Sequence, residues 1–495
     1  MDSFVRARYK VNRTPAFQML SEAQCREIYT AAVEILERTG AKVYDQESKE
    51  ILEKAGCWID GEVIRFPAGL TEWAVRTAPS RITMYNRDGK RCMVLEDGKT
   101  YYGPGPTNTY FRDPYTGERR RPVLKDNEDV GRVCDALPHI DFVEDLGTPT
   151  GITDTLADVY AFYALVRNTR KPIVHWGFDI EQYEDIVAMA AAVAGGLGKL
   201  QQKPFICLYS EPSSPLLHSR EAISKAVFAA RKKIPIVYTP CVMLGATTPA
   251  TMAGTLALGV AESLVGIVVS QLIYAGAPII MGGVYAIMDM QTTVFSYGSP
   301  EFQIMQAGIA EVARYMGVPV FGTAGCTDSH IMDGQAAAEA ALSILTAAQA
   351  GANLVHDVGY TGVGSCGSLE QLVLSDEIIG MVKRIMRGIV VDEETLAVDV
   401  VNNVGPGGHF LEEKHTLRHF RNEFWSPTLI NRMRYDEWRD VEKASTMGER
   451  TKAKLHQILE THEVPPLSKE VLAVLDQILA KAEEREAKKK KKKKN

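Results

Sequence analysis

The sequence predicts an α/β fold, a TIM-type (β/α)8 barrel with an N-terminal α+β extension and a C-terminal helical tail. Short apolar runs alternate with helical patterns from about residue 125 onward. The runs are continuous rather than alternating, which is typical of parallel strands that are covered on both faces. Five runs share a proline at the start of the strand, where no interior ladder hydrogen bond is lost: Pro172, Pro204, Pro235, Pro278 and Pro319.

Seven runs are candidate strands, at 139–143, 171–176, 203–209, 234–238, 277–281, 318–321 and 352–356. The intervals between them are long enough for a loop and a return helix. Helical patterns fill these intervals, at 181–194, 218–231, 249–273, 300–316, 333–350 and 370–386. The eighth strand of a barrel cannot be placed from the pattern. A doubly wound open sheet is the structural alternative.

Three segments follow from this pattern: an extension at 1–98, the barrel at 99–393 and a mixed tail at 394–495. A helix is expected to begin after Ser21, because Gln24 stands at capping-box spacing. A long charged helix is expected from about Ser468. The oligo-lysine run that ends the chain is expected to be a frayed, solvated tail.

Composition excludes several classes of partner. The net charge is −6 and 24% of residues are charged, so nothing favours nucleic acid. The N-terminus lacks the apolar core of a secretory signal, and the eight cysteines are scattered, which favours free thiols in the cytoplasm. Residues 253–281 are apolar, but Glu262, Gln271 and Pro278 interrupt them, so a buried helix and strand are expected instead of a membrane span. Self-association is left open.

The strand ends carry the candidate chemistry, because barrel enzymes react where the strands end. Aromatic side chains dominate there, with few bases. Such a set suits an organic cation, which ring faces hold at about 0.5–2 kcal/mol per contact. The candidate substrate-binding residues are Trp176, Tyr209, Glu211, Tyr285 and Tyr360, together with the polar turn from Cys326 to His330 and with His356.

Two weaker motifs have structural alternatives. Gly362, Gly364 and Gly367 form a GxGxxG string, but it starts too far beyond the strand at 352–356 for a dinucleotide turn, so a loop over the barrel mouth is favoured. Four cysteines could in principle converge as zinc ligands, although each suits a buried apolar position equally well. They are Cys207, Cys241, Cys326 and Cys366. No metal site is predicted.

Several stretches together resemble the trimethylamine:corrinoid methyltransferase superfamily. They are 326–335, Gly298–Glu301, 253–256 with Ala261-Glu262, and 368–373. The resemblance extends from about residue 20 to 465. It implies a barrel enzyme that passes a methyl group from a methylated amine to the cobalt of a separate corrinoid protein, or to free cob(I)alamin, and that binds no cofactor tightly.

One departure from this family bears on the substrate. The archaeal trimethylamine enzymes carry pyrrolysine in the loop where this chain has Cys326, or Thr327 if the alignment shifts by one. Members without pyrrolysine resemble enzymes for quaternary amines, and glycine betaine is the first candidate. Proline betaine, carnitine, γ-butyrobetaine and trimethylamine are the alternatives within the same reaction. A barrel that only binds quaternary ammonium ions, and a zinc methyltransferase, are alternatives of other classes.

The resemblance and the residues at the strand ends together predict roles. Asp328 supplies negative charge to the cation, and His356 or His330 donates to the betaine carboxylate. Asp328 and His356 are therefore the predicted catalytic residues. Cys326 is a small residue that leaves space where pyrrolysine would project. A quaternary nitrogen leaves as a neutral amine, so this reaction needs no general acid.

Overall fold

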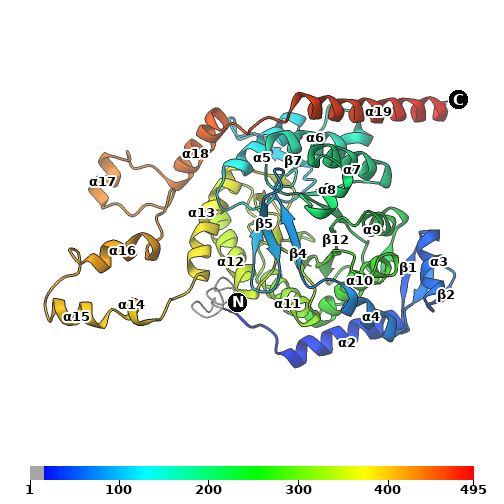
Figure 1. Ribbon diagram of the computed structural model, residues 1–495, viewed down its shortest axis with the longest axis horizontal. Coiled ribbons are helices and arrows are strands. Elements are labelled where there is room, and N and C mark those ends of the chain that lie inside the picture. The colour runs from blue at the N-terminus through cyan, green and yellow to red at the C-terminus, as the bar shows by residue number, and fades with distance from the viewer. Residues whose placement is uncertain (1–15, 495) are drawn as a thin grey trace.

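A parallel sheet forms the barrel wall in the computed structural model, which describes residues 16–494 (Figure 1). Its strand order is β6-β18-β17-β14-β12-β10-β9, and every pairing in it is parallel. The strands are β6 (Tyr101–Tyr102), β9 (Ile173–Trp176), β10 (Ile206–Ser210), β12 (Ile236–Tyr238), β14 (Ile279–Gly282), β17 (Val320–Thr323) and β18 (Leu354–His356).

The eighth position of the barrel is taken by the segment around Val143. The N–H of Phe142 donates to the Tyr102 carbonyl of β6 at 3.3 Å, and Val143 forms a parallel bridge with Ile173 of β9. The predicted strand at 139–143 thus closes the barrel through single bridges. The strand that sequence could not place is β6, which has only two residues and lies in a stretch of irregular sequence. The TIM-type barrel is confirmed.

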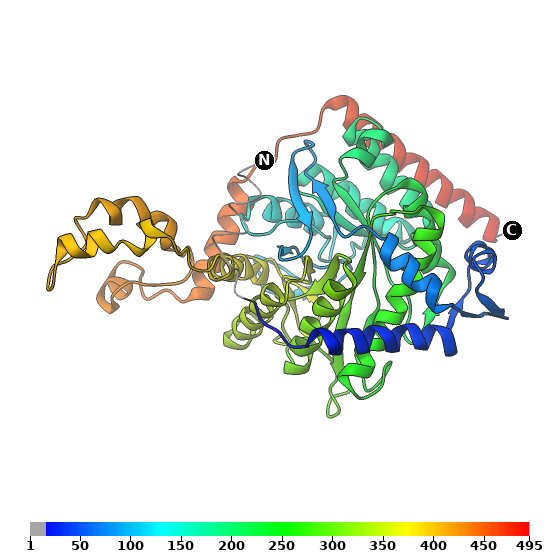
Figure 2. The ribbon, with the colours of Figure 1, turned by 60° about the horizontal axis from the view of Figure 1, so that its bottom comes forward.

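The outer helices follow the predicted rhythm (Figures 1 and 2). Side-chain caps begin several of them, as at Asp333, which accepts from the Ala336 N–H, and Gly351 ends the same helix in the left-handed conformation. The helices are α5 (Leu124–Ala136), α6 (Ala157–Asn168), α7 (Ile180–Ala194), α8 (Leu197–Gln202), α9 (Arg220–Lys232), α10 (Met252–Ile273), α11 (Pro300–Met316), α12 (Gly334–Ala350) and α13 (Leu369–Met386), with a 3-10 turn at Asp154–Leu156.

Helix α10 is the one described helix long and apolar enough to cross a membrane, and 83% of its most apolar window is buried inside the protein. Its polar residues have internal partners. Glu262 accepts from the Ser214 hydroxyl at 2.7 Å and from the Leu216 N–H at 2.6 Å, and the Gln271 amide donates to the Ala277 carbonyl. The expected buried helix followed by a strand is present.

The N-terminal extension closes the end of the barrel at which the parallel strands begin. The hairpin of β4 (Ile82–Tyr85) and β5 (Arg91–Leu95) inserts Ile82, Met84, Met93 and Leu95 among the inward-facing side chains of the strands, Phe321 and Val237 included. The chemistry is therefore confined to the opposite end. The remaining elements are α2 (Glu22–Arg38), which has the expected capping box, β1 (Ala41–Val43), α3 (Gln46–Lys54), β2 (Trp58–Asp60), β3 (Val63–Arg65) and α4 (Ala68–Thr77).

Short strands shape the loops between the barrel strands and helices. One small sheet has the order β13-β15-β16 and another β19-β20-β7-β8, while β11 joins the N-terminal sheet beside β1. Their bounds are β7 (Tyr110–Arg112), β8 (Arg119–Arg120), β11 (Leu217–His218), β13 (Cys241–Leu244), β15 (Val284–Met288), β16 (Phe295–Ser296), β19 (Tyr360–Thr361) and β20 (Cys366–Gly367).

The C-terminal tail first leaves the barrel as an arm and then returns to it (Figures 1 and 2). The arm helices contain no buried residue. They are α14 (Glu393–Leu396), α15 (Val398–Val404), α16 (Lys414–Glu423) and α17 (Tyr435–Asp440). Helix α18 (Met447–Thr461) then packs on α13 and α5, and α19 (Lys469–Lys494) packs on α7 and α6.

For the part that the structure describes, the expected fraying of the lysine tail is wrong, whereas its expected exposure to solvent is confirmed for residues 488–492. Helix α19 runs on to Lys494, and the Lys489 ammonium contacts Glu181 of α7 and Glu486 of its own helix, the latter at 2.9 Å. Lys489 is thus held by ion pairs to α7 and to its own helix, and the lysine run in the sequence gives no indication of these partners.

Candidate active site

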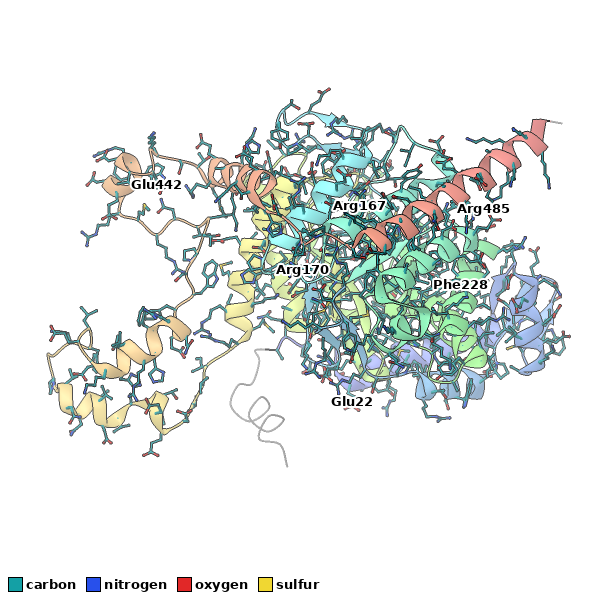
Figure 3. All side chains as sticks on the ribbon, turned by 45° about the horizontal axis from the view of Figure 1, so that its top comes forward. Glu22, Arg167, Arg170, Phe228, Glu442 and Arg485 are labelled. Carbon is teal, nitrogen blue, oxygen red and sulfur yellow. The ribbon has the colours of Figure 1, made fainter. Side chains whose placement is uncertain are left out.

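A cavity of about 810 Å³ lies where the barrel strands end. Its wall combines the residues that follow β9, β10 and β18 with the loop at 106–109 and one face of α19, where Arg485 lies (Figure 3). The predicted residues Trp176, Tyr209, Glu211, His356 and Tyr360 all line this cavity. The strand ends bring them together because parallel strands of a barrel present their carboxyl ends at one face.

Aromatic rings form much of the wall. The Tyr209 and His356 rings meet edge to face at 5.9 Å, and the Tyr297 and Tyr360 rings do so at 6.3 Å. The buried ammonium of Lys225 lies 4.8 Å from the Trp176 ring and donates to the Gly177 carbonyl. The protein itself therefore already places one cation against this tryptophan.

Carboxylates share the cavity with the rings. Glu211 accepts a hydrogen bond from the Tyr209 hydroxyl. Asp357 is 1% exposed, and its Oδ1 lies 3.0 Å from His356 Nδ1 without the alignment of a hydrogen bond; neither of its oxygens has a donor among the described residues. The burial of Glu211 raises the pKa of its carboxyl, and the hydrogen bond from Tyr209 opposes this rise.

Glu144 lies behind this wall, directly after the segment that closes the barrel. It is fully buried, and within the described chain neither carboxyl oxygen has a hydrogen-bond partner. Burial, followed by the nearby Asp357, Asp145 and Glu211, raises the pKa of Glu144 well above its ordinary value. The cavity is thus surrounded by carboxyl groups that compete for protons or for a cation.

The backbone is fitted closely around Asp357. Asp357 itself has φ +67°, a left-handed conformation that is uncommon for a residue with a side chain and that clusters at functional sites. A Cβ on Gly105 would lie 2.0 Å from Asp357 Oδ1 and 2.5 Å from the Tyr360 ring. The Tyr360 hydroxyl donates to the Pro106 carbonyl. The irregular loop after β6 therefore faces the cavity.

The turn from Cys326 to His330 does not reach the cavity. Glu339 of α12 binds it from outside, accepting from the Thr327 hydroxyl at 2.5 Å and from the Asp328 N–H at 2.9 Å. Cys326 is fully buried in the hydrophobic core, and His330 is exposed. Neither residue lines the cavity, in contrast to our expectation.

Asp328 and Tyr285 also lie elsewhere than we expected. The Asp328 carboxylate accepts from the Ser296 hydroxyl at 2.6 Å and from the Tyr297 N–H at 2.8 Å, so it fixes a loop and does not line the cavity. Tyr285 points away from the barrel axis into α10, where a Cβ on Gly259 would lie 2.4 Å from its hydroxyl. Asp357, unlike Asp328, lines the cavity.

Sequence reasoning passed over three residues of this site. Glu144 and Asp357 each directly follow a barrel strand, and this position was a usable signal. Tyr297 directly follows β16, which is not a strand of the barrel wall, so its place in the sequence gave no signal of a position at the cavity. Cys241 also lines the cavity, where it is exposed.

The two weaker motifs have structural roles. Gly362 and Gly364 lie in the turn between β19 and β20 and have positive φ, and Gly364 lines the cavity, whereas Gly367 lies in β20. Within the described residues, the cysteines form no cluster with metal-ligand spacing. The one group of that kind is Glu394, His415 and His419, in the arm.

Fold and cavity together define an α/β barrel whose mouth is aromatic and anionic. The chain belongs to the family described as trimethylamine methyltransferase (MTTB), whose model matches residues 2–487. It is 34% identical over 466 residues to a trimethylamine methyltransferase MttB of Desulfitobacterium hafniense, covering 94% of each chain. It is 31% identical to a glycine betaine methyltransferase of Desulfitobacterium hafniense strain Y51, covering 94% of this chain and 97% of the relative.

A solved structure shows the same fold. The monomethylamine methyltransferase of Methanosarcina barkeri superposes with a TM-score of 0.52 at 11% identity, covering 92% of this chain and 91% of the other. The family resemblance inferred from sequence is confirmed, and so is its barrel architecture.

Proposed function

We propose that this protein transfers a methyl group from a quaternary ammonium ion to the cobalt(I) of a separate corrinoid protein. The observation that carries the proposal is the cavity wall, which combines aromatic rings with Asp357, a buried carboxylate that has no hydrogen-bond donor among the described residues. A quaternary nitrogen offers no N–H and is held by ring faces and negative charge. The wall supplies both.

The chemistry of the substrate explains why the wall needs no acid. Cobalt(I) attacks the methyl carbon with an electron pair, the carbon–nitrogen bond breaks, and its pair stays on nitrogen. The leaving group is a neutral tertiary amine, so no proton is transferred. The positive charge on nitrogen decreases as the bond breaks. A site with very strong attraction for the cation would therefore stabilise the bound substrate more than the transition state.

Orientation is then the main contribution of the protein. Trp176, Tyr209, Tyr297 and Tyr360 would hold the ammonium group, and Glu211 and Asp357 would balance its charge. One methyl would face the open end of the cavity, where the corrinoid protein docks. Positioning of two reactants and exclusion of water are well-attested sources of rate. We place the reaction in the cytoplasm, consistent with the eight free cysteines.

Glycine betaine is the substrate suggested by the similarity to a glycine betaine methyltransferase. Trimethylamine is the second candidate, because the unpaired oxygens of Asp357 could accept the N–H of a trimethylammonium ion. A barrel that binds quaternary ammonium ions without turnover remains the alternative of another class.

Methyl transfer to free cob(I)alamin separates these possibilities. Purified protein, cob(I)alamin and single amines are mixed, and methylcobalamin is followed by absorbance. We expect transfer from quaternary ammonium ions and a fall in kcat/KM of about 10- to 100-fold in Asp357→Asn, since removing the charge loses part of a Coulomb attraction of about 4 kcal/mol for unit charges about 4 Å apart at an effective dielectric constant of about 20. Binding without transfer would establish the non-catalytic alternative, and turnover of trimethylamine alone would overturn the quaternary substrate.

A further inference from the structure

We infer that the substrate cation has no carboxylate beside its nitrogen, so that choline-like or tetraalkylammonium ions are preferred to betaines. The inference rests on the proposed function and narrows its substrate. Its basis is the charge around the cavity. Among the described residues, the wall holds the carboxylates of Asp154, Asp158, Asp179, Glu181, Glu211, Asp357 and Glu486.

Only two side chains of this wall, within the part of the chain that the structure describes, carry a permanent positive charge. Both come from α19, and both are already paired. Arg485 lies 2.6 Å from an Asp185 oxygen and 3.1 Å from a Glu181 oxygen. Lys489 contacts Glu181 and lies 2.9 Å from a Glu486 oxygen. A substrate carboxylate would have to compete with these protein carboxylates for each cation.

Backbone donors near the cavity are occupied in the same way. The N-terminus of α7 would suit an anion, but Asp179 accepts from the Gln182 N–H at 3.0 Å, and the Phe178 N–H donates to Asp158 at 3.1 Å. In the loop after β6, the Thr107 N–H donates to Asp145 at 2.7 Å. Carboxylates of the protein therefore already accept from these three N–H groups, which a substrate carboxylate would otherwise use.

His356 also lines the wall, and it is the residue that we predicted to hold a betaine carboxylate. Its Nε2 lies 3.1 Å from the Thr323 hydroxyl. Its Nδ1 lies 3.0 Å from Asp357 Oδ1. A carboxylate brought to Nδ1 would lie beside Asp357, and like charges at such a distance repel strongly when water is excluded. The geometry thus opposes the predicted contact.

Choline and glycine betaine form a suitable pair of test substrates, because they share a trimethylammonium group and differ mainly in an alcohol against a carboxylate. We expect KM for choline and for tetramethylammonium to be at least tenfold lower than for glycine betaine in methyl transfer to cob(I)alamin. Equal or lower KM for glycine betaine would overturn the inference. It would leave the proposed function intact, since methyl transfer from a quaternary amine would still have been observed.

Calorimetric binding of the same three ions, without corrinoid, keeps the two proposals separable. If no ion is demethylated but choline binds more tightly than glycine betaine, the proposed function fails, and the preference for a cation without a carboxylate holds for binding alone. Asp357→Asn should reduce the ratio of choline affinity to glycine betaine affinity by about tenfold. The variant loses attraction for the cation of both ions, but it also loses repulsion of the betaine carboxylate. Asp60→Asn, on the exposed strand β2, is the charge-matched control and should leave the preference unchanged. An unaltered preference in Asp357→Asn would contradict the role of this charge.

Discussion

The Asp328 carboxylate accepts the Tyr297 N–H at 2.8 Å, and the Tyr297 ring in turn lies 6.3 Å from the Tyr360 ring in the cavity wall. A residue of the turn after β17 thereby positions an aromatic ring from a different loop. This arrangement gives Asp328 an effect on the site without contact with a substrate.

Asp328→Ala should therefore act through Tyr297. We expect KM for the ammonium substrate to rise several-fold with little change in kcat, because the ring loses its fixed position but the carboxylates remain. The free energy of unfolding should fall by about 1–3 kcal/mol, the cost of leaving the Tyr297 N–H without its acceptor. Steady-state kinetics and urea unfolding measure the two effects. Asp436→Asn, an exposed carboxylate of the arm, is the control. A fall in kcat alone would instead indicate direct participation of Asp328.

Gly105 is predicted to tolerate no side chain. A Cβ there would lie 2.0 Å from Asp357 Oδ1, so Gly105→Ala must displace the carboxylate or the loop. We expect a loss of cation binding of tenfold or more and a destabilisation of about 1–3 kcal/mol from overpacking.

Gly198→Ala is the matched control for Gly105→Ala. It lies in helix α8, and a Cβ there meets no atom of the described residues within 4 Å apart from its chain neighbours and the backbone of its own helix. This variant should keep its cation affinity and gain about 0.5–1 kcal/mol from the higher helix propensity of alanine. Calorimetry and thermal unfolding of both variants give the comparison. Unchanged cation binding in Gly105→Ala would show that Asp357 does not contact the substrate.

The buried carboxyls predict opposite effects of pH on binding and on stability. Burial raises the pKa values of Glu144 and Glu211, so both are more protonated at low pH and cation affinity should increase with pH. A folded-state pKa above the unfolded value favours the folded protein at low pH, and this stabilisation is lost as pH rises toward and through the folded pKa.

Glu144→Gln tests the stability half of this argument, because its side chain stays neutral at every pH. The variant should lose less stability than the parent as pH rises above the ordinary pKa of a glutamate, and it should also show a weaker pH dependence of cation affinity. Thermal unfolding and calorimetric titration at several pH values measure both. Parallel stability curves for parent and variant would indicate that Glu144 is not the group that titrates.

The barrel could be predicted from sequence because most of its strands carry a local sequence signal. Proline followed by a continuous apolar run marks β9, β10, β12, β14 and β17, and burial on both faces explains why the run does not alternate. Strand β6 has no such run, because it has only two residues. The neighbouring segment at 141–143 pairs through single bridges, so a longer strand is not needed to close the barrel there. Its existence depends on contacts distant in sequence.

The site was predictable to the same extent. Trp176, Tyr209, Glu211, His356 and Tyr360 were found because they stand at or near strand ends, and the barrel brings all strand ends to one face. The turn at 326–330 stands at such an end too, but Glu339 on α12 draws it outward. Whether a turn faces the cavity or the helices is decided by partners remote in the chain. The side chains of α19 are missed for the same reason.

Helix α19 gives the last prediction, because it makes the predicted tail at 394–495 part of the cavity wall. Lys489 contacts Glu181 of α7 and Glu486, both of which line the cavity. Lys489→Glu would place a third carboxylate beside these two. An exposed pair is worth only about 0.2–1 kcal/mol, so global stability should hardly change, whereas repulsion should loosen the end of α19.

Lys492→Glu is the matched control, since it makes the same charge change one turn further along, on an exposed side chain. We expect faster proteolytic cleavage near the end of α19 and a several-fold change in KM for Lys489→Glu, with neither effect in Lys492→Glu. High salt should reduce the difference between the two variants, because it screens exposed charges. Identical behaviour of both would show that α19 adds charge to the cavity rim without holding its shape.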